Sequence, residues 1–174
     1  MHTIYTVGHS TRTIEQFIEL LRAHGIEELV DVRTVPRSRH NPQFGKEELA
    51  AFLQQAGIVY THLGKLGGLR YATKDSVNLG WQNTSFRGFA DYTATPEFQA
   101  GLEELKALAE EKPVAIMCAE AVPWRCHRSL IADALTIQGW QVLHIQSRKT
   151  ASPHKLTPFL KVQDGKITYP APEE

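Results

Sequence analysis

The sequence predicts an α/β fold: a single three-layer, Rossmann-like domain with a mostly parallel sheet of about five strands, plus a C-terminal β-hairpin. Short apolar runs, typical of buried strands, alternate with amphipathic segments typical of helices. This alternation is the pattern of strand–helix–strand units, in which the strands pair in parallel. The 174 residues are enough to bury one full core, so we expect residues 1–174 to form one domain.

The predicted elements follow one another in the order that such a fold requires. Apolar runs predict strands at residues 4–7, 29–32, 58–62, 114–117 and 141–145. Amphipathic segments predict helices at residues 14–24, 45–56, 89–108 and 129–138. Thr13 and Gln16 form a capping box before the first helix, and Thr95 is a cap with Pro96 at the first helical position.

Three segments lack these periodic patterns. Residues 33–44 form a basic loop with two prolines, and a loop of that length in a compact domain is more often functional than idle. Residues 63–88 are rich in glycine, and we expect either a lid over a ligand or a partly ordered loop. Residues 147–174 form a tail: 148–155 are basic and irregular, and 159–169 predict a hairpin around Asp164-Gly165.

Composition excludes several classes of protein. Hydrophobic content is 42% and charged content 22%, and no apolar run approaches the ~18 residues of a membrane span, so we expect no membrane partner. The N-terminus enters a strand-like run without a signal-peptide pattern, which predicts a cytoplasmic protein. Two cysteines do not make a disulfide framework and are expected as thiols. Zero net charge argues against bulk attraction to nucleic acid. The oligomeric state is left open.

Polar residues gather where the predicted strands end, and ligands of open parallel sheets bind outside the carboxyl ends of the strands. The densest stretch is 113–135, which contains both cysteines. We predict catalytic roles for Glu120 and His9. Residues expected to bind the ligand are Ser10, Arg33, Arg37, Ser38, Gly67, Gly68, Cys118, Cys126, His127 and Arg128. No metal ligand is assigned, and the missing G-x-G-x-x-G after the first strand speaks against a dinucleotide, so no cofactor is expected.

Charge at the start of the helix after residue 128 favours an anionic ligand. His127 and Arg128 oppose the helix macrodipole there, so a bound anion or the Glu120 carboxylate is expected to compensate them. The positive neighbours and the dipole should also make Cys126 more reactive than Cys118. We do not expect His127 to act as a base for Cys126, because neighbouring helical side chains diverge by roughly 100°.

The favoured interpretation is a protein that binds a small anionic or nucleotide-like ligand, and an enzyme would use Glu120 as acid or base on a phosphate-bearing, nucleotide or nucleic-acid-derived substrate. Whether it is an enzyme stays open. One alternative is a non-catalytic nucleotide or nucleic-acid binding module, with Trp81, Phe86 and Trp124 as stacking surfaces. Another is a zinc-dependent hydrolase using Cys118, Cys126 and His127.

The catalytic motifs of two well-known enzyme classes match this sequence less well. In cysteine phosphatases and rhodanese-like enzymes, an arginine follows the cysteine after five residues, whereas six residues separate Cys118 from Arg125, and Trp124 occupies the arginine's place. Cys118-Ala119-Glu120 matches the tripeptide of zinc nucleoside deaminases, but the later Pro-Cys-x-x-Cys pair of those enzymes is missing.

Several short motifs occur together and in order. They are Val7-Gly8-His9-Ser10, Asp31-Val32-Arg33 with Pro36 and Ser38, Leu63-Gly64 with Gly67-Gly68, Gly88-Phe89 with Tyr92, and Met117-Cys118-Ala119-Glu120 followed by Cys126-His127-Arg128 and Ile131-Ala132-Asp133. In these motifs the chain resembles the uncharacterised bacterial and archaeal proteins of domain of unknown function family 488. The resemblance covers residues 4–146. It implies an α/β domain with a polar site at these loops and implies no particular reaction.

Overall fold

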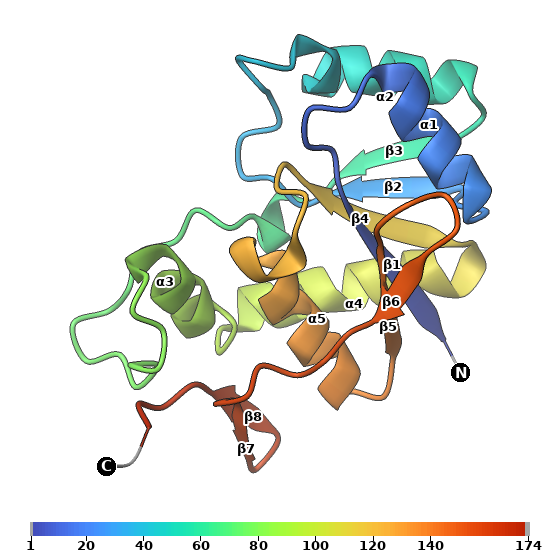
Figure 1. The fold of residues 1–174 in the computed structure, drawn as a ribbon. Coiled ribbons are helices and arrows are strands. Elements are labelled where there is room, and N and C mark those ends of the chain that lie inside the picture. The colour runs from blue at the N-terminus through green and yellow to red at the C-terminus, as the bar shows by residue number, and fades with distance from the viewer. Residues whose placement is uncertain (1, 173–174) are drawn as a thin grey trace.

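A six-stranded sheet forms the centre of the structure, a computed structural model that describes residues 2–172 (Figure 1). The spatial order is β3-β2-β4-β1-β5-β6. The strands are β1 (Thr3–Gly8), β2 (Glu28–Asp31), β3 (Val59–His62), β4 (Val114–Cys118), β5 (Gln141–Ile145) and β6 (Ala151–Pro153). The first five pair in parallel, and β6 runs antiparallel to β5. The predicted α/β class and mostly parallel sheet are confirmed.

Helices cover both faces of the sheet and make the three layers (Figure 1). The helices α1 (Ile14–Ala23) and α2 (Lys46–Gln55) lie on one face. The opposite face carries α3 (Thr84–Tyr92), α4 (Pro96–Glu111) and α5 (Arg128–Ile137). Alternate residues of β4 supply the two cores: Ile116 packs in the α3–α5 cluster, and Met117 in the α1–α2 cluster. A strand covered on both faces is expected to be a continuous apolar run, as β4 is.

The local signals at element ends act as predicted. Thr13 accepts a hydrogen bond from the Gln16 amide, and the Gln16 side chain accepts one from the Thr13 amide, completing the capping box of α1. Thr95 caps α4 with Pro96 at its first position. The hairpin of β7 (Lys161–Gln163) and β8 (Lys166–Thr168) turns at Asp164 and Gly165, both with positive φ.

Two segments are more regular than the sequence indicates. The predicted helix at 89–108 is two helices, and the first begins at Thr84 because the Asn83 side chain accepts hydrogen bonds from the Ser85 and Phe86 amides. The segment 63–88 therefore contains the first turn of α3 as well as the 3-10 turn η2 (Gly64–Leu66). The tail segment 148–155, expected to be irregular, contributes β6, a three-residue edge strand that ends at Pro153.

The sheet order brings two loops from distant parts of the chain together. Because β4 inserts between β1 and β2, the loops that follow β1 and β4 are neighbours at the carboxyl edge. The His9 amide donates to the Cys118 carbonyl at 3.0 Å, and the Ser10 amide donates to the Ala119 carbonyl at 2.9 Å. These bonds continue the β1–β4 pairing past the strand ends and fix both loops at a switch in strand order, where open α/β sheets bind ligands. Between residues 2 and 172, no helix has both the length and the apolar composition to cross a membrane.

Candidate functional site

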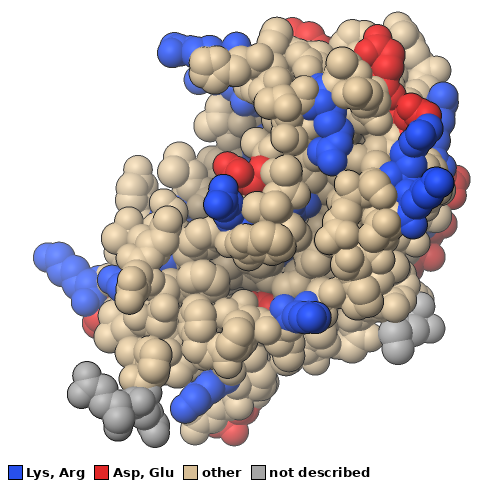
Figure 2. Space-filling view, viewed as in Figure 1, with Lys and Arg blue, Asp and Glu red and all other residues tan. Residues whose placement is uncertain are grey.

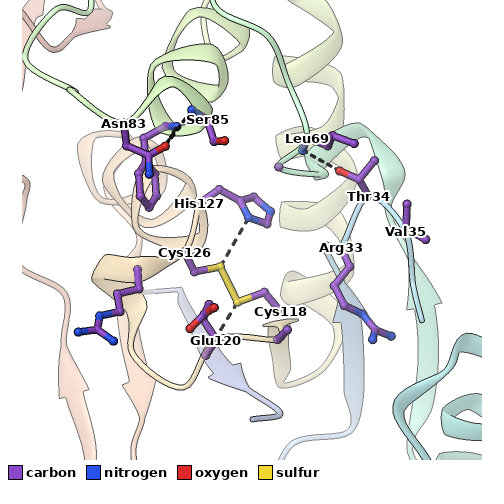
Figure 3. A pocket seen from close by; sticks show the side chains of 14 residues that line it. Arg33, Thr34, Val35, Leu69, Asn83, Ser85, Cys118, Glu120, Cys126 and His127 are labelled. Carbon is purple, nitrogen blue, oxygen red and sulfur yellow. Dashed lines mark hydrogen bonds between the residues drawn. A yellow bond between two sulfur atoms is a disulfide. The ribbon is translucent and has the colours of Figure 1, made fainter. Parts of the chain in front are cut away.

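A cavity of about 430 Å³ opens at the carboxyl edge of the sheet (Figure 3). It lies on the α3–α5 side, between the loops that follow β2 and β4, the start of α3 and the start of α5. The 3-10 turn η3 (Pro123–Arg125) contributes Arg125 to its wall. Its lining residues are Arg33, Thr34, Val35, Gly68, Leu69, Asn83, Ser85, Phe86, Cys118, Ala119, Glu120, Arg125, Cys126 and His127.

The cavity brings together half of the predicted site residues. Six of them line it: Arg33, Gly68, Cys118, Glu120, Cys126 and His127. The other six do not: His9, Ser10, Arg37, Ser38, Gly67 and Arg128. Thr34, Asn83 and Ser85 line it without having been singled out in the sequence. The sequence marks Thr34 only as a loop threonine and Asn83 only as a possible helix cap. In the structure the Thr34 hydroxyl accepts a hydrogen bond from the Leu69 amide, and the Asn83 side chain accepts one from the Ser85 amide.

Arg33 is committed to a buried ion pair with Asp31. Its Nε and Nη2 donate to the two carboxylate oxygens of Asp31 at 2.9 and 2.7 Å, and Tyr60 donates to Asp31 as well. Burial and the hydrogen bond to Asp31 raise the pKa of Tyr60. Figure 3 shows the guanidinium of Arg33 turned away from the cysteines. The residue that was expected to clamp an anion therefore contributes little positive charge to the cavity.

Arg128 supports the cavity from behind. It is 1% exposed, and its Nη2 donates to the carbonyls of Glu120 and Ala121 at 2.9 and 3.3 Å. Its Nη1 donates to the Thr6 hydroxyl at 3.3 Å. Burial lowers the pKa of Arg128 to about 10, so it stays charged at neutral pH. The carbonyls of the chain itself thus compensate this cation, and no bound anion is needed to explain it.

The β1 loop residues lie on the other side of the sheet edge. His9 is buried, its ring stacks on Phe44 with centroids 4.3 Å apart, and its Nδ1 lies 2.8 Å from the Ser10 carbonyl. Burial lowers the pKa of His9, so the ring is neutral at pH 7. Its Nε2 is buried without a partner among residues 2–172. Ser10 adopts a positive φ of 51°. Neither side chain lines the cavity, so the placement gives no support to a catalytic role for His9 there.

The remaining predicted binding residues have local partners or none. Arg37 is exposed in the loop after β2, and the Ser38 hydroxyl accepts from the Asn41 amide. Gly67 and Gly68 were predicted to bind the ligand: Gly68 lines the cavity and Gly67 does not, and the backbone of both also approaches side chains of the protein itself. A Cβ on Gly68 would stand 2.5 Å from Nδ1 of His127, and one on Gly67 would stand 2.6 Å from Oγ1 of Thr34.

The two cysteines correct the expectation of free thiols. Cys118 and Cys126 are joined as a disulfide that forms part of the cavity wall (Figure 3). His127 also corrects an expectation, because its Nδ1 lies 3.5 Å from Sγ of Cys126. The two side chains can meet because Cys126 is not helical: its φ and ψ are −140° and 149°, and α5 begins after it. The 100° divergence of helical neighbours does not apply there.

The same contacts remove the support for a zinc site. The sulfurs of Cys118 and Cys126 are bonded to each other and are not free to act as thiolate ligands. His127 Nε2 lies 2.9 Å from the Val32 carbonyl. Nowhere in residues 2–172 do three or more His, Cys, Asp or Glu side chains group in a way that could hold a metal ion.

A buried hydrogen-bonded chain that the sequence did not predict runs behind the cavity. It passes from Arg128 through Thr6, His144 and His154 to Asp133. Nδ1 of His144 lies 2.5 Å from the Thr6 hydroxyl, and Nε2 of His144 lies 2.8 Å from Nδ1 of His154. Nε2 of His154 lies 2.7 Å from Asp133. Every step has one donor and one acceptor if both histidines are neutral. A histidine between the apolar residues Leu143 and Ile145 of the fifth strand is the sequence signal of it.

Comparison with known proteins identifies the family. Residues 13–135, which are 123 of the 174 residues, match the family described as "Domain of unknown function DUF488". The match includes the Asp31-Val32-Arg33 and Cys118–Arg128 motifs and leaves the Val7–Ser10 motif outside. Neither a curated protein nor a solved structure shows a significant match to the chain. The chain belongs to the DUF488 family, whose description assigns it no function.

Proposed function

We propose that the cavity binds a small phosphate-bearing or nucleotide-like molecule and that Glu120 acts on it as a general acid or base. The main support for this proposal is the position of Glu120. Its exposed side chain lines the cavity, and no hydrogen bond or ion pair within residues 2–172 engages its carboxylate. A carboxylate in a cavity with no structural partner is free to exchange a proton with a ligand.

The rest of the lining suits a small polar ligand. Arg125 supplies a cation that is not buried, and the amide of Asn83 and hydroxyls of Thr34 and Ser85 supply neutral polar groups. Phe86 and Leu69 add apolar surface. Mixed lining with a few polar groups is typical of small-molecule sites. Arg125 therefore replaces Arg33, Arg37 and Arg128 as the cation proposed to attract the anion.

Ligand identification is the first experiment. A thermal-shift screen of nucleotides, sugar phosphates and oligonucleotides should find a compound that raises the melting temperature. A ligand at 100 times its Kd stabilises the native state by about 2.7 kcal/mol, or roughly 5–10 °C for a chain of this size. The Arg125→Ala variant should lose much of that shift. A hit that shifts the Arg125→Ala variant as much as the wild type would contradict the assigned role of Arg125.

The catalytic role of Glu120 is tested by Glu120→Gln. This change removes the titrating group at nearly constant shape, so turnover of the identified ligand should fall by about 10²–10⁴-fold while ligand affinity stays similar. Glu110→Gln, at the exposed C-terminal end of α4 and the opposite edge of the sheet, is the matched control and should keep full activity. Unchanged turnover in Glu120→Gln would exclude the acid–base role.

A second candidate is a non-catalytic nucleotide or nucleic-acid binding module. Phe86 lines the cavity, and Trp124, beside Arg125 on η3, is 67% exposed, so both rings can stack on bases. Trp81 is less suited, because it packs against Phe86, Phe159 and Tyr169. Figure 2 shows basic side chains scattered among acidic ones on this face, which favours a short ligand over a long polyanion. Under this candidate Glu120→Gln binds equally well or better, and no turnover of any hit is found.

A further inference from the structure

The only two cysteines of the sequence meet in the wall of the cavity. Cys118 ends β4, Cys126 lies two residues before the start of α5, and they are eight positions apart. Since β4 and α5 already pack against each other in the same core, the bond links no parts of the fold that would otherwise be separate. The disulfide lines the cavity, where a small molecule can reach it, and this position favours a role in thiol–disulfide exchange over a role in stabilising the fold.

The surroundings distinguish the two sulfurs. The Arg128 amide, at the start of the ten-residue helix α5, donates to Sγ of Cys126 at 3.5 Å. An amide donor and the positive end of the helix dipole both favour a thiolate. Within residues 2–172, the hydrogen-bond partner of Cys118 Sγ is the Glu120 carbonyl, 3.8 Å away, which can only accept and so favours the protonated thiol. The geometry alone thus makes Cys126 the better nucleophile.

His127 adds a second contact to Cys126. Its Nε2 faces the Val32 carbonyl, an acceptor, and the tautomer that satisfies this contact carries the hydrogen on Nε2 and leaves a lone pair on Nδ1, 3.5 Å from the sulfur. Burial lowers the pKa of His127 to about 4, which keeps this ring neutral at pH 7. Gly68 lies so close to the ring that a Cβ would collide with it. The imidazole is therefore held beside Cys126 and can accept a hydrogen bond from its thiol in the reduced state.

We propose that Cys118 and Cys126 form a reversible dithiol–disulfide centre, in which Cys126 is the sulfur that exchanges with low-molecular-weight thiols and disulfides entering the cavity. The proposal goes beyond ligand binding at Glu120 and does not depend on it.

The chemistry balances with a small disulfide as the oxidant. The Cys126 thiolate attacks one sulfur of R–S–S–R, and one RS⁻ leaves, giving a mixed disulfide at Cys126. Cys118 then loses its proton to solvent and attacks Sγ of Cys126, and the second RS⁻ leaves. Two electrons pass from the protein dithiol to the small disulfide, and each departing RS⁻ takes up one proton. Reduction by excess small thiol follows the same steps in reverse, beginning at Cys126.

The first test uses the full-length protein. Purified under air, it should resist alkylation by iodoacetamide until dithiothreitol is added, as read by intact mass. After reduction, peptide mapping of a time course should show Cys126 modified about tenfold or more faster than Cys118 near neutral pH, the ratio that one unit of pKa difference gives. The proposal would be overturned if both cysteines are alkylated rapidly without reduction, even after treatment with oxidised glutathione. It would also be overturned if, after reduction with dithiothreitol, the two cysteines are alkylated at equal rates.

Single variants locate the exchanging sulfur. With oxidised glutathione, the Cys118→Ser variant should accumulate a mixed disulfide at Cys126, because the second step is removed. The Cys126→Ser variant should form the adduct about tenfold more slowly. Far-UV circular dichroism checks that both fold, and the alanine variant at the same position, Cys118→Ala or Cys126→Ala, replaces a serine variant that does not. Equal adduct rates, or an adduct at Cys118 alone, contradict the proposal, and the wild-type alkylation ratio decides it if the variants are unstable.

Discussion

Asp133 illustrates how one buried residue can organise a distant part of the chain. Its carboxylate, fully buried in α5, accepts four hydrogen bonds: from His154 at 2.7 Å, from the Thr157 amide and hydroxyl at 3.1 and 2.7 Å, and from the Tyr169 hydroxyl at 2.8 Å. Burial and the neighbouring carboxylate raise the pKa of Tyr169. A carboxylate can be buried at tolerable cost only when its oxygens are satisfied in this way. Asp133 therefore anchors the tail to the helix that begins at the cavity.

Replacing Asp133 by Asn tests that anchor. The NH₂ of Asn donates where one oxygen of Asp133 accepts, so the two hydrogen bonds of that oxygen are lost or must be reversed by turning a hydroxyl, while the partners stay buried. We expect the free energy of unfolding to fall by about 2–4 kcal/mol in urea denaturation. Asp75→Asn, in an exposed loop, is the matched control and should change stability by less than about 0.5 kcal/mol. Equal stability of the two variants would show that the tail is not held through Asp133.

At the scale of elements, the turn η2 is fitted against the start of α5. The contact is between the backbone of Gly68, just after η2, and the ring of His127, the residue before α5. There is no room for a side chain at Gly68, whereas the nearest atom to a Cβ on Gly64 would be 3.8 Å away, an ordinary contact. The two glycines thus offer a matched comparison within one short segment.

Gly68→Ala should push η2 and α5 apart or displace His127. Overpacking of this kind costs typically about 1–3 kcal/mol, and we expect a loss in that range in urea denaturation. Because His127 contacts Cys126, the alkylation rate of reduced Cys126 should change as well. Gly64→Ala should leave both quantities nearly unchanged. If Gly68→Ala is as stable as Gly64→Ala and its Cys126 reacts at the wild-type rate, the packing of η2 on His127 is not as described.

At the scale of the whole molecule, buried neutral histidines tie stability to pH. Burial, together with the charges of His154 and Arg128, lowers the pKa of His144 to about 3, and burial lowers the pKa of His127 to about 4. In the unfolded chain both titrate near pH 6.5. Below that pH the unfolded state binds more protons than the folded state, so stability is fully present above about pH 6.5 and is lost as the pH falls toward the folded pKa values.

We therefore expect the free energy of unfolding to fall between pH 6.5 and pH 5, by up to about 1.4 kcal/mol per pH unit for each histidine. Urea denaturation at several pH values in this window measures the slope, in a range where most carboxylates stay ionised. His144→Gln should reduce the slope by the contribution of one titrating histidine, and His40→Gln, in the exposed loop, should leave the slope unchanged. A flat profile for the wild type would mean that these rings take up protons in the folded state as readily as in the unfolded chain.

The proposal that residues 1–174 form one domain belongs to the same scale. Tyr169 packs in the α3–α5 core, and its backbone bonds Asn78 and Gly80, so the tail joins the core in space although it lies outside the residues of the family match. A tail held in this way should unfold together with the sheet.

Periodicity and end signals in the sequence determined the fold class, because they report local physics. Apolar runs predicted the five parallel strands, and Thr13, Thr95, Pro96 and the Asp164-Gly165 turn marked element ends, since capping and turn geometry involve neighbouring residues. The start of α3 was missed although its cap, Asn83, is visible in the sequence. The edge strand β6 was missed because three residues ending in proline carry little strand signal.

The sequence also pointed to the carboxyl edge of the sheet for the candidate site, because strand–helix alternation predicts parallel strands, whose carboxyl ends lie at one edge. It could not decide where each charged side chain points. Arg33 lies two residues after Asp31, so a shared face was foreseeable, but the engagement of its guanidinium by Asp31 was not. The bond between Cys118 and Cys126, the contact of His127 with Cys126, and the chain from Arg128 to Asp133 depend on tertiary structure alone. Thr6 and His144 are 138 positions apart and become partners because β1 and β5 pair in the sheet, and no local pattern encodes a contact formed at that distance.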